Sequence, residues 1–141
     1  MSEILVNKLT GTSTAGSILV TGEGNSTTTN LQQGLAKAWG LFNGTGTIAI
    51  RDSFNVSGIT DLATGKMTVT IASDMGSANY TTALRSDLDD SAGASRTYNP
   101  EVYTRAAGSF NFVTYSNSAE EDHAYDEVAV QGDLACVKQQ N

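Results

Sequence analysis

The sequence predicts an all-β protein, an antiparallel β-sandwich or jelly-roll-like barrel with one short helix and an extended N-terminal arm. Short segments in which apolar and polar residues alternate recur along the chain, and glycine-containing turns separate them. Serine and threonine together outnumber the charged residues, a composition that suits strands and turns better than helices. A chain of 141 residues is enough for one hydrophobic core. We expect three parts: an attachment and oligomerisation arm (1–30), a short helix and connector (31–43) and a β-sandwich domain (44–141).

The N-terminal arm is poor in residues that could form a core. Half of residues 1–30 are glycine, serine or threonine, and the apolar residues fall into two small clusters, Ile4 to Val6 and Ile18 to Val20. Such a segment cannot bury enough apolar surface alone to offset the entropy of ordering it. It must therefore pack on the rest of its own chain or on another chain, and we favour association with copies of itself or with a larger particle.

One short helix is predicted after the arm. The run Thr27 to Asn30 offers N-cap residues, and the apolar residues that follow have the i, i+4, i+7, i+8 spacing of a helix over 31–39. Gly34 costs this helix about 1 kcal/mol relative to alanine, so the helix needs a surface to pack on. Its apolar stripe either covers its own sheet or forms a seam between copies around a three-fold axis. The candidate interface residues of arm and stripe are Ile4, Val6, Ile18, Val20, Leu31, Leu35 and Trp39.

The stretch 44–80 predicts a β-hairpin. The first strand carries Ile48, Ile50, Phe54 and Val56 on one parity, and Met67, Val69 and Ile71 repeat the pattern after the turn 63–66. Both strands therefore present one apolar face to a core.

Further strands are expected towards the C-terminus, at Tyr80 to Arg85, Tyr98 to Arg105, Ser109 to Tyr115 and Asp126 to Gln131. Phe110 and Phe112 share a face, as do Val128 and Val130, so each of these two strands has one buried side. The polar connections 86–97 and 116–124 are where such folds place recognition surfaces.

Composition and motifs exclude several classes of function. The net charge of −7 and the few scattered cationic residues argue against a nucleic-acid partner. No apolar run approaches the roughly 20 residues of a membrane span, and the N-terminus lacks a signal-peptide pattern. His123 is the only histidine, and no nucleophile-elbow pattern accompanies it, so we predict neither an enzyme nor a cofactor.

Two acidic segments are the candidates for a metal site. Asp87, Asp89 and Asp90 form one, and the cluster from Glu120 to Glu127 forms the other. Calcium binds clustered carboxylate oxygens, but neither spacing matches the EF-hand loop, and charge runs are usually solvated. No metal site is assigned, and calcium binding by an acidic loop stays open.

Tyrosines near the polar loops offer a second kind of surface chemistry. A tyrosine combines an apolar ring with a hydroxyl, which suits stacking on sugars, although packing at a core or an edge is the more common fate. The candidates are Tyr98, Tyr103, Tyr115 and Tyr125.

The stretch 44–80 also resembles a module of tail-fibre and other virion proteins of marine bacteriophages. The residues that carry the resemblance are GTGT followed by AIRDSFNVS and ITD, then TGKMTV, and a small-residue turn that ends in ANY. The opening segment Glu3 to Leu9 is similar to the N-terminal attachment strands of many such proteins. The similarity is loose after Tyr80, and the chain has no long shaft.

The resemblance implies a virion protein, assembled in the host cytoplasm, without catalytic residues. Related modules form fibres or surface projections, usually as homotrimers. We therefore expect a homotrimeric short fibre or fibre tip, attached to the tail and contributing to host attachment. The alternative is a capsid decoration protein, a cement or head fibre that stabilises the phage head. The expected partners are further copies of this chain, other virion proteins of tail or capsid, and a host-surface glycan or protein.

Overall fold

The computed structural model describes residues 3–11, 18–21, 27–87 and 99–135. The chain divides into two compact units, Met1–Leu35 and Ala36–Asn141. In the N-terminal unit, β1 (Leu19–Thr21) pairs with β2 (Thr28–Asn30) in antiparallel fashion, and α1 (Leu31–Gly34) follows directly. The side chain of Asn30 caps α1, because its Oδ1 accepts a hydrogen bond from the Gln33 amide at 3.1 Å.

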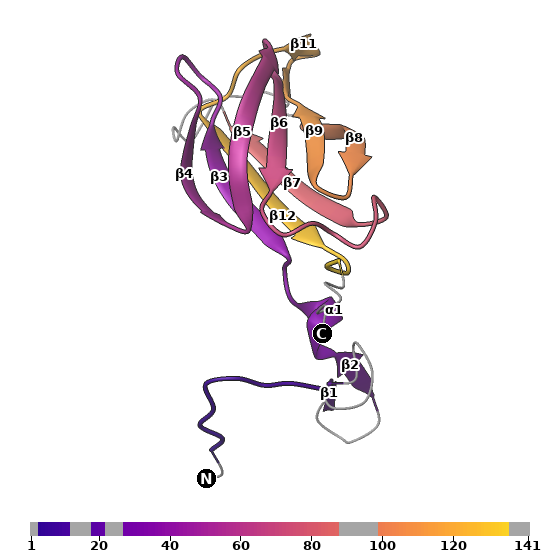
Figure 1. Cartoon of the computed structure of the whole chain (residues 1–141). Helices are drawn as coiled ribbons and strands as arrows, with labels where there is room; N and C mark the ends of the chain where they lie inside the picture. Colours follow the sequence, from indigo (N-terminus) through magenta and orange to yellow (C-terminus); the bar gives the residue numbers. More distant parts are fainter. Residues whose placement is uncertain (1–2, 12–17, 22–26, 88–98, 136–141) are drawn as a thin grey trace, which may run out of the picture. The chain divides into compact units, whose positions relative to one another are not determined.

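The larger unit consists of two four-stranded antiparallel sheets that stack face to face (Figure 1). Sheet I has the order β4 (Ala49–Phe54), β3 (Ala38–Asn43), β12 (Tyr125–Gln131), β7 (Thr81–Asp87). Sheet II has the order β5 (Val56–Ala63), β6 (Lys66–Ile71), β9 (Ser109–Val113), β8 (Glu101–Ala106). A small hairpin pairs β10 (Tyr115–Ser116) with β11 (Ala119–Glu120). The all-β prediction is confirmed, whereas closure into a jelly-roll barrel stays a prediction.

The core lies between the two sheets and follows the two-residue period of the strands. Tyr80 and Phe110 meet edge to face, with ring centroids 6.5 Å apart, and the Tyr80 hydroxyl lies 3.0 Å from the carbonyl oxygens of Ala106 and Ser109. Gly40 faces inward on β3, where a Cβ would overlap the ring of Phe42. The core cluster comprises Ala38, Phe42, Met67, Val69, Ile71, Met75, Tyr80, Phe110, Phe112, Val128 and Val130.

The chain passes from sheet I to sheet II at Asn55, which has a positive φ of 57°. Its side-chain amide donates to the carbonyl oxygens of Lys37 at 2.9 Å and Ser73 at 3.1 Å, and its Oδ1 accepts from the Ser73 amide at 2.7 Å. Asparagine tolerates this backbone conformation better than most residues. The chain therefore turns at Asn55 from one sheet to the other, where the sequence pattern predicted one continuous strand.

The predicted hairpin differs from the structure in its first strand. The prediction that Phe54 lies on the buried parity is wrong, because a β-bulge in β4 opposite Leu41 and Phe42 shifts its register, and Phe54 then pairs with Trp39 on the outer face, where it is 53% exposed. The β5–β6 hairpin itself is confirmed, with Ala63 paired to Lys66 across the turn. Gly65 in that turn has a φ of 69°, which glycine adopts without strain.

The predicted helix over 31–39 is wrong in its second half. α1 ends at Gly34, Leu35 has an extended backbone, and Ala38–Asn43 forms β3 inside sheet I. The apolar spacing of 31–39 fits a helix, but alternate residues from Ala38 to Phe42 are buried, which is the period of a strand. The region 31–43, predicted as helix and connector, thus supplies an inner strand of the sandwich.

The predictions for the later strands are confirmed by β7, β8, β9 and β12. Phe110, Phe112, Val128 and Val130 face the core as their parity indicated. Of the two polar connections, 116–124 contains most of the β10–β11 hairpin, and residues 88–97 of the other lie outside the described residues.

Candidate functional site

The candidate interface residues of the N-terminal unit are mostly exposed. Ile4 is 85% exposed, and Val6, Val20 and Leu35 are exposed as well. Ile18 and Leu31 are half-buried and adjacent, since the Leu31 amide donates to the Ile18 carbonyl oxygen at 2.8 Å. The unit therefore presents apolar side chains that its own residues leave uncovered.

The seventh candidate, Trp39, belongs to the sandwich and lies on the outer face of sheet I. A row of outward positions crosses the four strands of this sheet, because Trp39 pairs with Phe54 on β4 and with Ala129 on β12, and Ala129 pairs with Ala83 on β7. Trp39 is 38% exposed. We call this row the aromatic–alanine row. It places two large rings beside two methyl groups on a surface that faces away from the core.

The corresponding row on sheet II has a different chemistry. Thr60 pairs with Thr68, Thr68 with Asn111, and Asn111 with Thr104. The Thr68 hydroxyl donates to Asn111 Oδ1 at 2.9 Å. This polar row suits contact with water, so the two outer faces of the sandwich are not equivalent.

A buried polar cluster lies at one end of the space between the sheets. Asp126 on β12 pairs directly with Ser86 on β7, and both side chains point inward with Val128 and Val130. The Ser86 hydroxyl donates to Asp126 Oδ1 at 2.5 Å and also contacts His123 Nδ1. Ser86, His123 and Asp126 are all buried. The sequence pattern did not predict this cluster, although Asp126 shares its parity with the two valines, which indicated a buried position.

Burial changes the acidity of Asp126. Desolvation raises the pKa of its carboxyl group to about 7, the hydrogen bond from Ser86 lowers that pKa, and the charge of Asp122 raises it. The carboxyl group therefore titrates close to neutral pH.

The geometry of the cluster differs from that of a nucleophilic triad. In a serine-histidine-aspartate triad, the imidazole lies between the serine and the aspartate. Here the Ser86 hydroxyl lies between the imidazole of His123 and the carboxyl group of Asp126. This arrangement fixes strands β7 and β12 to the segment that carries His123.

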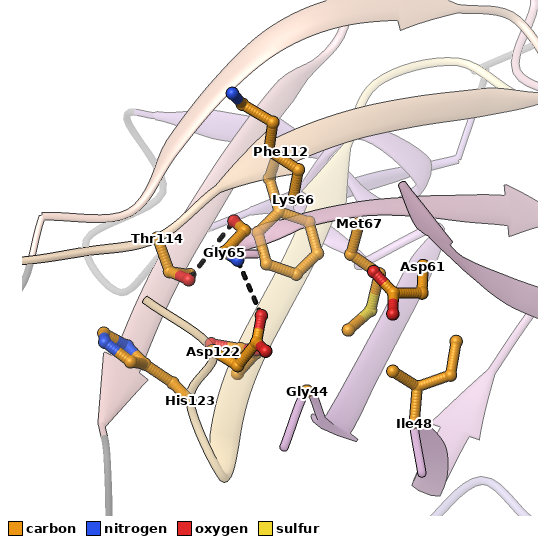
Figure 2. Close-up of a pocket in the computed structure, with 11 residues that line it drawn as sticks. Gly44, Ile48, Asp61, Gly65, Lys66, Met67, Phe112, Thr114, Asp122 and His123 are labelled. Carbon is orange, nitrogen blue, oxygen red and sulfur yellow. Dashed lines mark hydrogen bonds between the residues drawn. The ribbon is translucent and has the colours of Figure 1, made fainter. Parts of the chain in front are cut away.

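At the same end of the sandwich, hydrogen bonds hold the β5–β6 turn in place (Figure 2). The Gly65 amide donates to Asp122 Oδ1 at 2.6 Å, and its carbonyl oxygen accepts from the Thr114 amide at 2.8 Å. A Cβ on Gly65 would lie 2.8 Å from the Thr114 carbonyl oxygen, so the turn has no room for a side chain. A cavity of about 10 Å³ beside these residues has room for about one water molecule.

A larger, open hollow lies beside the β10–β11 hairpin. It has a volume of about 630 Å³ and is lined by Asn99, Glu101, Tyr115, Asn117 and Ser118. Asn117 and Ser118 both have positive φ, 50° and 73°, as in a two-residue type I′ turn.

The candidate sugar-stacking tyrosines lie apart. Tyr115 lines the hollow, and Tyr103 on β8 is exposed. The Arg51 guanidinium covers the Tyr125 ring at 4.6 Å from its centroid. Tyr98 lies outside the described residues.

The acidic segments form no evident metal centre in the described part of the chain. Among the described residues, no three histidine, cysteine or acidic side chains are grouped so that they could hold a metal ion. Asp89 and Asp90 lie outside those residues. From the acidic cluster, Glu120 forms an ion pair with Lys66 at 2.5 Å. Within the described ranges, no helix has the length and apolar character needed to cross a membrane.

Comparison with protein families, curated proteins and solved structures finds no match for this chain. The resemblance of residues 44–80 to virion proteins stays a prediction.

Proposed function

We propose that this chain is a structural protein of a bacteriophage virion, a homotrimeric short fibre or fibre tip that is attached to the tail and contributes to host attachment. The observation that carries the proposal is the uncovered apolar surface of the N-terminal unit. Ile4 and Leu5 are 85% and 84% exposed, and Val6 and Leu9 are exposed beside them. Contiguous exposed apolar side chains mark a surface that packs on another protein.

The sandwich supports a role in recognition more than one in catalysis. The hollow beside Tyr115 is lined by amide, hydroxyl and carboxyl groups around one aromatic ring, which is chemistry that suits a glycan. The hollow favours host attachment over capsid decoration, the second candidate.

The position of the chain on purified particles tests the proposal. Labelling with an antibody against the sandwich, followed by electron microscopy, should mark the tail. Label on the head would replace the fibre with the decoration protein, and absence from infectious particles would overturn a virion role. Light scattering on the purified full chain should give the mass of three copies, and a stable monomer would contradict the homotrimer.

A charge placed in the N-terminal unit tests the attachment surface. Leu5→Asp should abolish incorporation into particles, because it places a carboxylate within the exposed apolar cluster. Asn7→Asp adds the same charge two residues away on an exposed polar position and is the matched control. Equal incorporation of the two variants would show that the apolar cluster does not mediate attachment.

A further inference from the structure

We infer that the outer face of sheet I is the surface through which copies of this chain pack together, with Trp39 and Phe54 of one copy seated against Ala129 and Ala83 of the next. The inference rests on the self-association in the proposed function and assigns it a surface. Its basis is the aromatic–alanine row, in which two large side chains on β4 and β3 are followed by two small side chains on β12 and β7.

The size gradient makes the face complementary to itself. The half formed by β4 and β3 carries the two exposed rings, and the half formed by β12 and β7 carries the two methyl groups. A hollow of about 270 Å³ lies over the second half, lined by Ala83, Arg85, Glu127 and Ala129 together with Leu84 and Val128. The large half of one copy therefore has a depression to enter on its neighbour.

The adjacent row carries charged side chains on both halves. Asp52 pairs with Leu41 and lies on the large half, and Arg85 pairs with Glu127 on the small half. The Arg85 guanidinium donates to Glu127 at 2.8 Å and to Asp87 at 3.0 Å, and it remains exposed. When strands of two copies run in the same direction, equal rows stay level, so Asp52 of one copy lies level with Arg85 and its two carboxylate partners on the next. The size gradient therefore selects the partner, a second copy of this chain.

Contact between unlike halves of one face agrees with a three-fold assembly. Three copies around an axis parallel to their strands can each place the large half on the small half of the next copy, and the ring closes after three steps. Four strands about 4.8 Å apart and about 20 Å long give a face of roughly 400 Å². Stable interfaces bury about 800 Å² per partner, so this face contributes part of the contact area and leaves the rest to other surfaces.

A swap of residue sizes tests the inference on the full chain. Trp39→Ala should raise the concentration at which the assembly half-dissociates by about tenfold or more, because a large aromatic side chain at the centre of an interface carries much of its binding energy. Ala129→Trp should do the same by filling the hollow. The double variant, Trp39→Ala with Ala129→Trp, restores one large and one small side chain at each contact and should recover most of the association. Analytical ultracentrifugation over a dilution series measures all three.

The opposite face supplies the control. Thr68→Trp places the same ring at the centre of the polar row on sheet II and should leave the half-dissociation concentration unchanged. Circular dichroism establishes that each variant is folded, and Trp39→Ala gives a reading even if Ala129→Trp does not fold. Unchanged association in Trp39→Ala, or equal weakening by Thr68→Trp, would overturn the inference while a virion role stands. A wild-type chain that is monomeric at all concentrations would overturn both the inference and the homotrimer.

Discussion

The two sheets of the sandwich obey the rule of an apolar inside and a polar outside to different degrees. Sheet II follows it on its two inner strands, with Phe110 and Val69 towards the core and Thr68 and Asn111 towards solvent, and its exposed Leu62 and Tyr103 lie on the edge strands β5 and β8. Sheet I departs from it on both faces. Trp39 and Phe54 lie outside, and Ser86 and Asp126 lie inside.

The difference indicates which sheet carries the functional constraints. Where local choices agree with the fold, as in sheet II, stability alone explains them. Departures persist where another requirement acts, and sheet I carries one on each of its four strands, β3, β4, β7 and β12. Under the proposed self-association, sheet II has chiefly a structural role and sheet I the interaction role.

The largest expected effect on stability comes from comparing a ring on the inner face of sheet II with a ring on the outer face of sheet I. Phe110 is 1% exposed and packs on Tyr80 and Phe112, so Phe110→Ala should lower the free energy of unfolding by about 3–5 kcal/mol. Phe54→Ala removes the same ring from the outer face of sheet I and should cost about 1 kcal/mol or less. Urea titrations followed by circular dichroism compare the two variants. Similar losses would contradict the contrast.

The buried acid of sheet I should make stability depend on pH. The folded pKa of Asp126 is about 7, above an unfolded pKa of about 4, so the folded state holds the proton more tightly. The stability that Asp126 contributes is then largest below about pH 4, is lost as the pH rises to about 7 and does not change above it. The difference is up to about 4 kcal/mol, at 1.36 kcal/mol for each unit.

Urea titrations between pH 4 and 8 measure this dependence. Asp126→Asn removes the titrating group and should flatten the fall in stability between pH 4 and 7. Ser86→Ala removes a hydrogen bond that lowers the pKa of Asp126, so it should extend the fall to higher pH. Identical pH profiles for the wild-type chain and Asp126→Asn would show that Asp126 ionises as freely in the folded chain as in the unfolded one.

The sequence predicted sheet II better than sheet I for a physical reason. The strand Lys66–Ile71 alternates strictly, and Ser109–Val113 alternates up to Phe112, so parity determines their buried faces. In sheet I, β3 contains alanine, tryptophan and two consecutive apolar residues, and this pattern also fits the apolar stripe of a helix. The segment forms a strand because it pairs with β4 and β12. Tertiary pairing of this kind is not visible in a single segment.

The candidate sites were predicted less completely than the fold. Trp39 was identified as an interface residue from a helical stripe that the structure does not form, and its neighbours in the row come from β4, β12 and β7. The cluster of Ser86, His123 and Asp126 joins residues up to 40 positions apart. Short-range spacing carries no information about such contacts, which depend on strand order and register.

The corner that joins the two sheets should have an intermediate effect. Asn55→Ala loses three side-chain hydrogen bonds and places alanine at a φ of 57°, which should together cost about 2–3 kcal/mol. Asn55→Gly loses the same hydrogen bonds but adopts that backbone conformation freely, so it should cost less. Thermal unfolding of the two variants separates the contributions. An equal loss would show that the backbone conformation at Asn55 contributes nothing.

The smallest expected effect concerns the polar row on sheet II. Thr68→Val keeps a β-branched side chain and loses the hydrogen bond to Asn111, so it should cost less than about 1 kcal/mol. On the outer face of sheet I, Trp39→Thr replaces an aromatic side chain with a polar one. It should also change the free energy of unfolding little, but it should weaken association. Urea titration and ultracentrifugation of both variants measure the two properties separately. If Thr68→Val alters association as much as Trp39→Thr does, both outer faces contact other molecules, and the division of roles between the sheets does not hold.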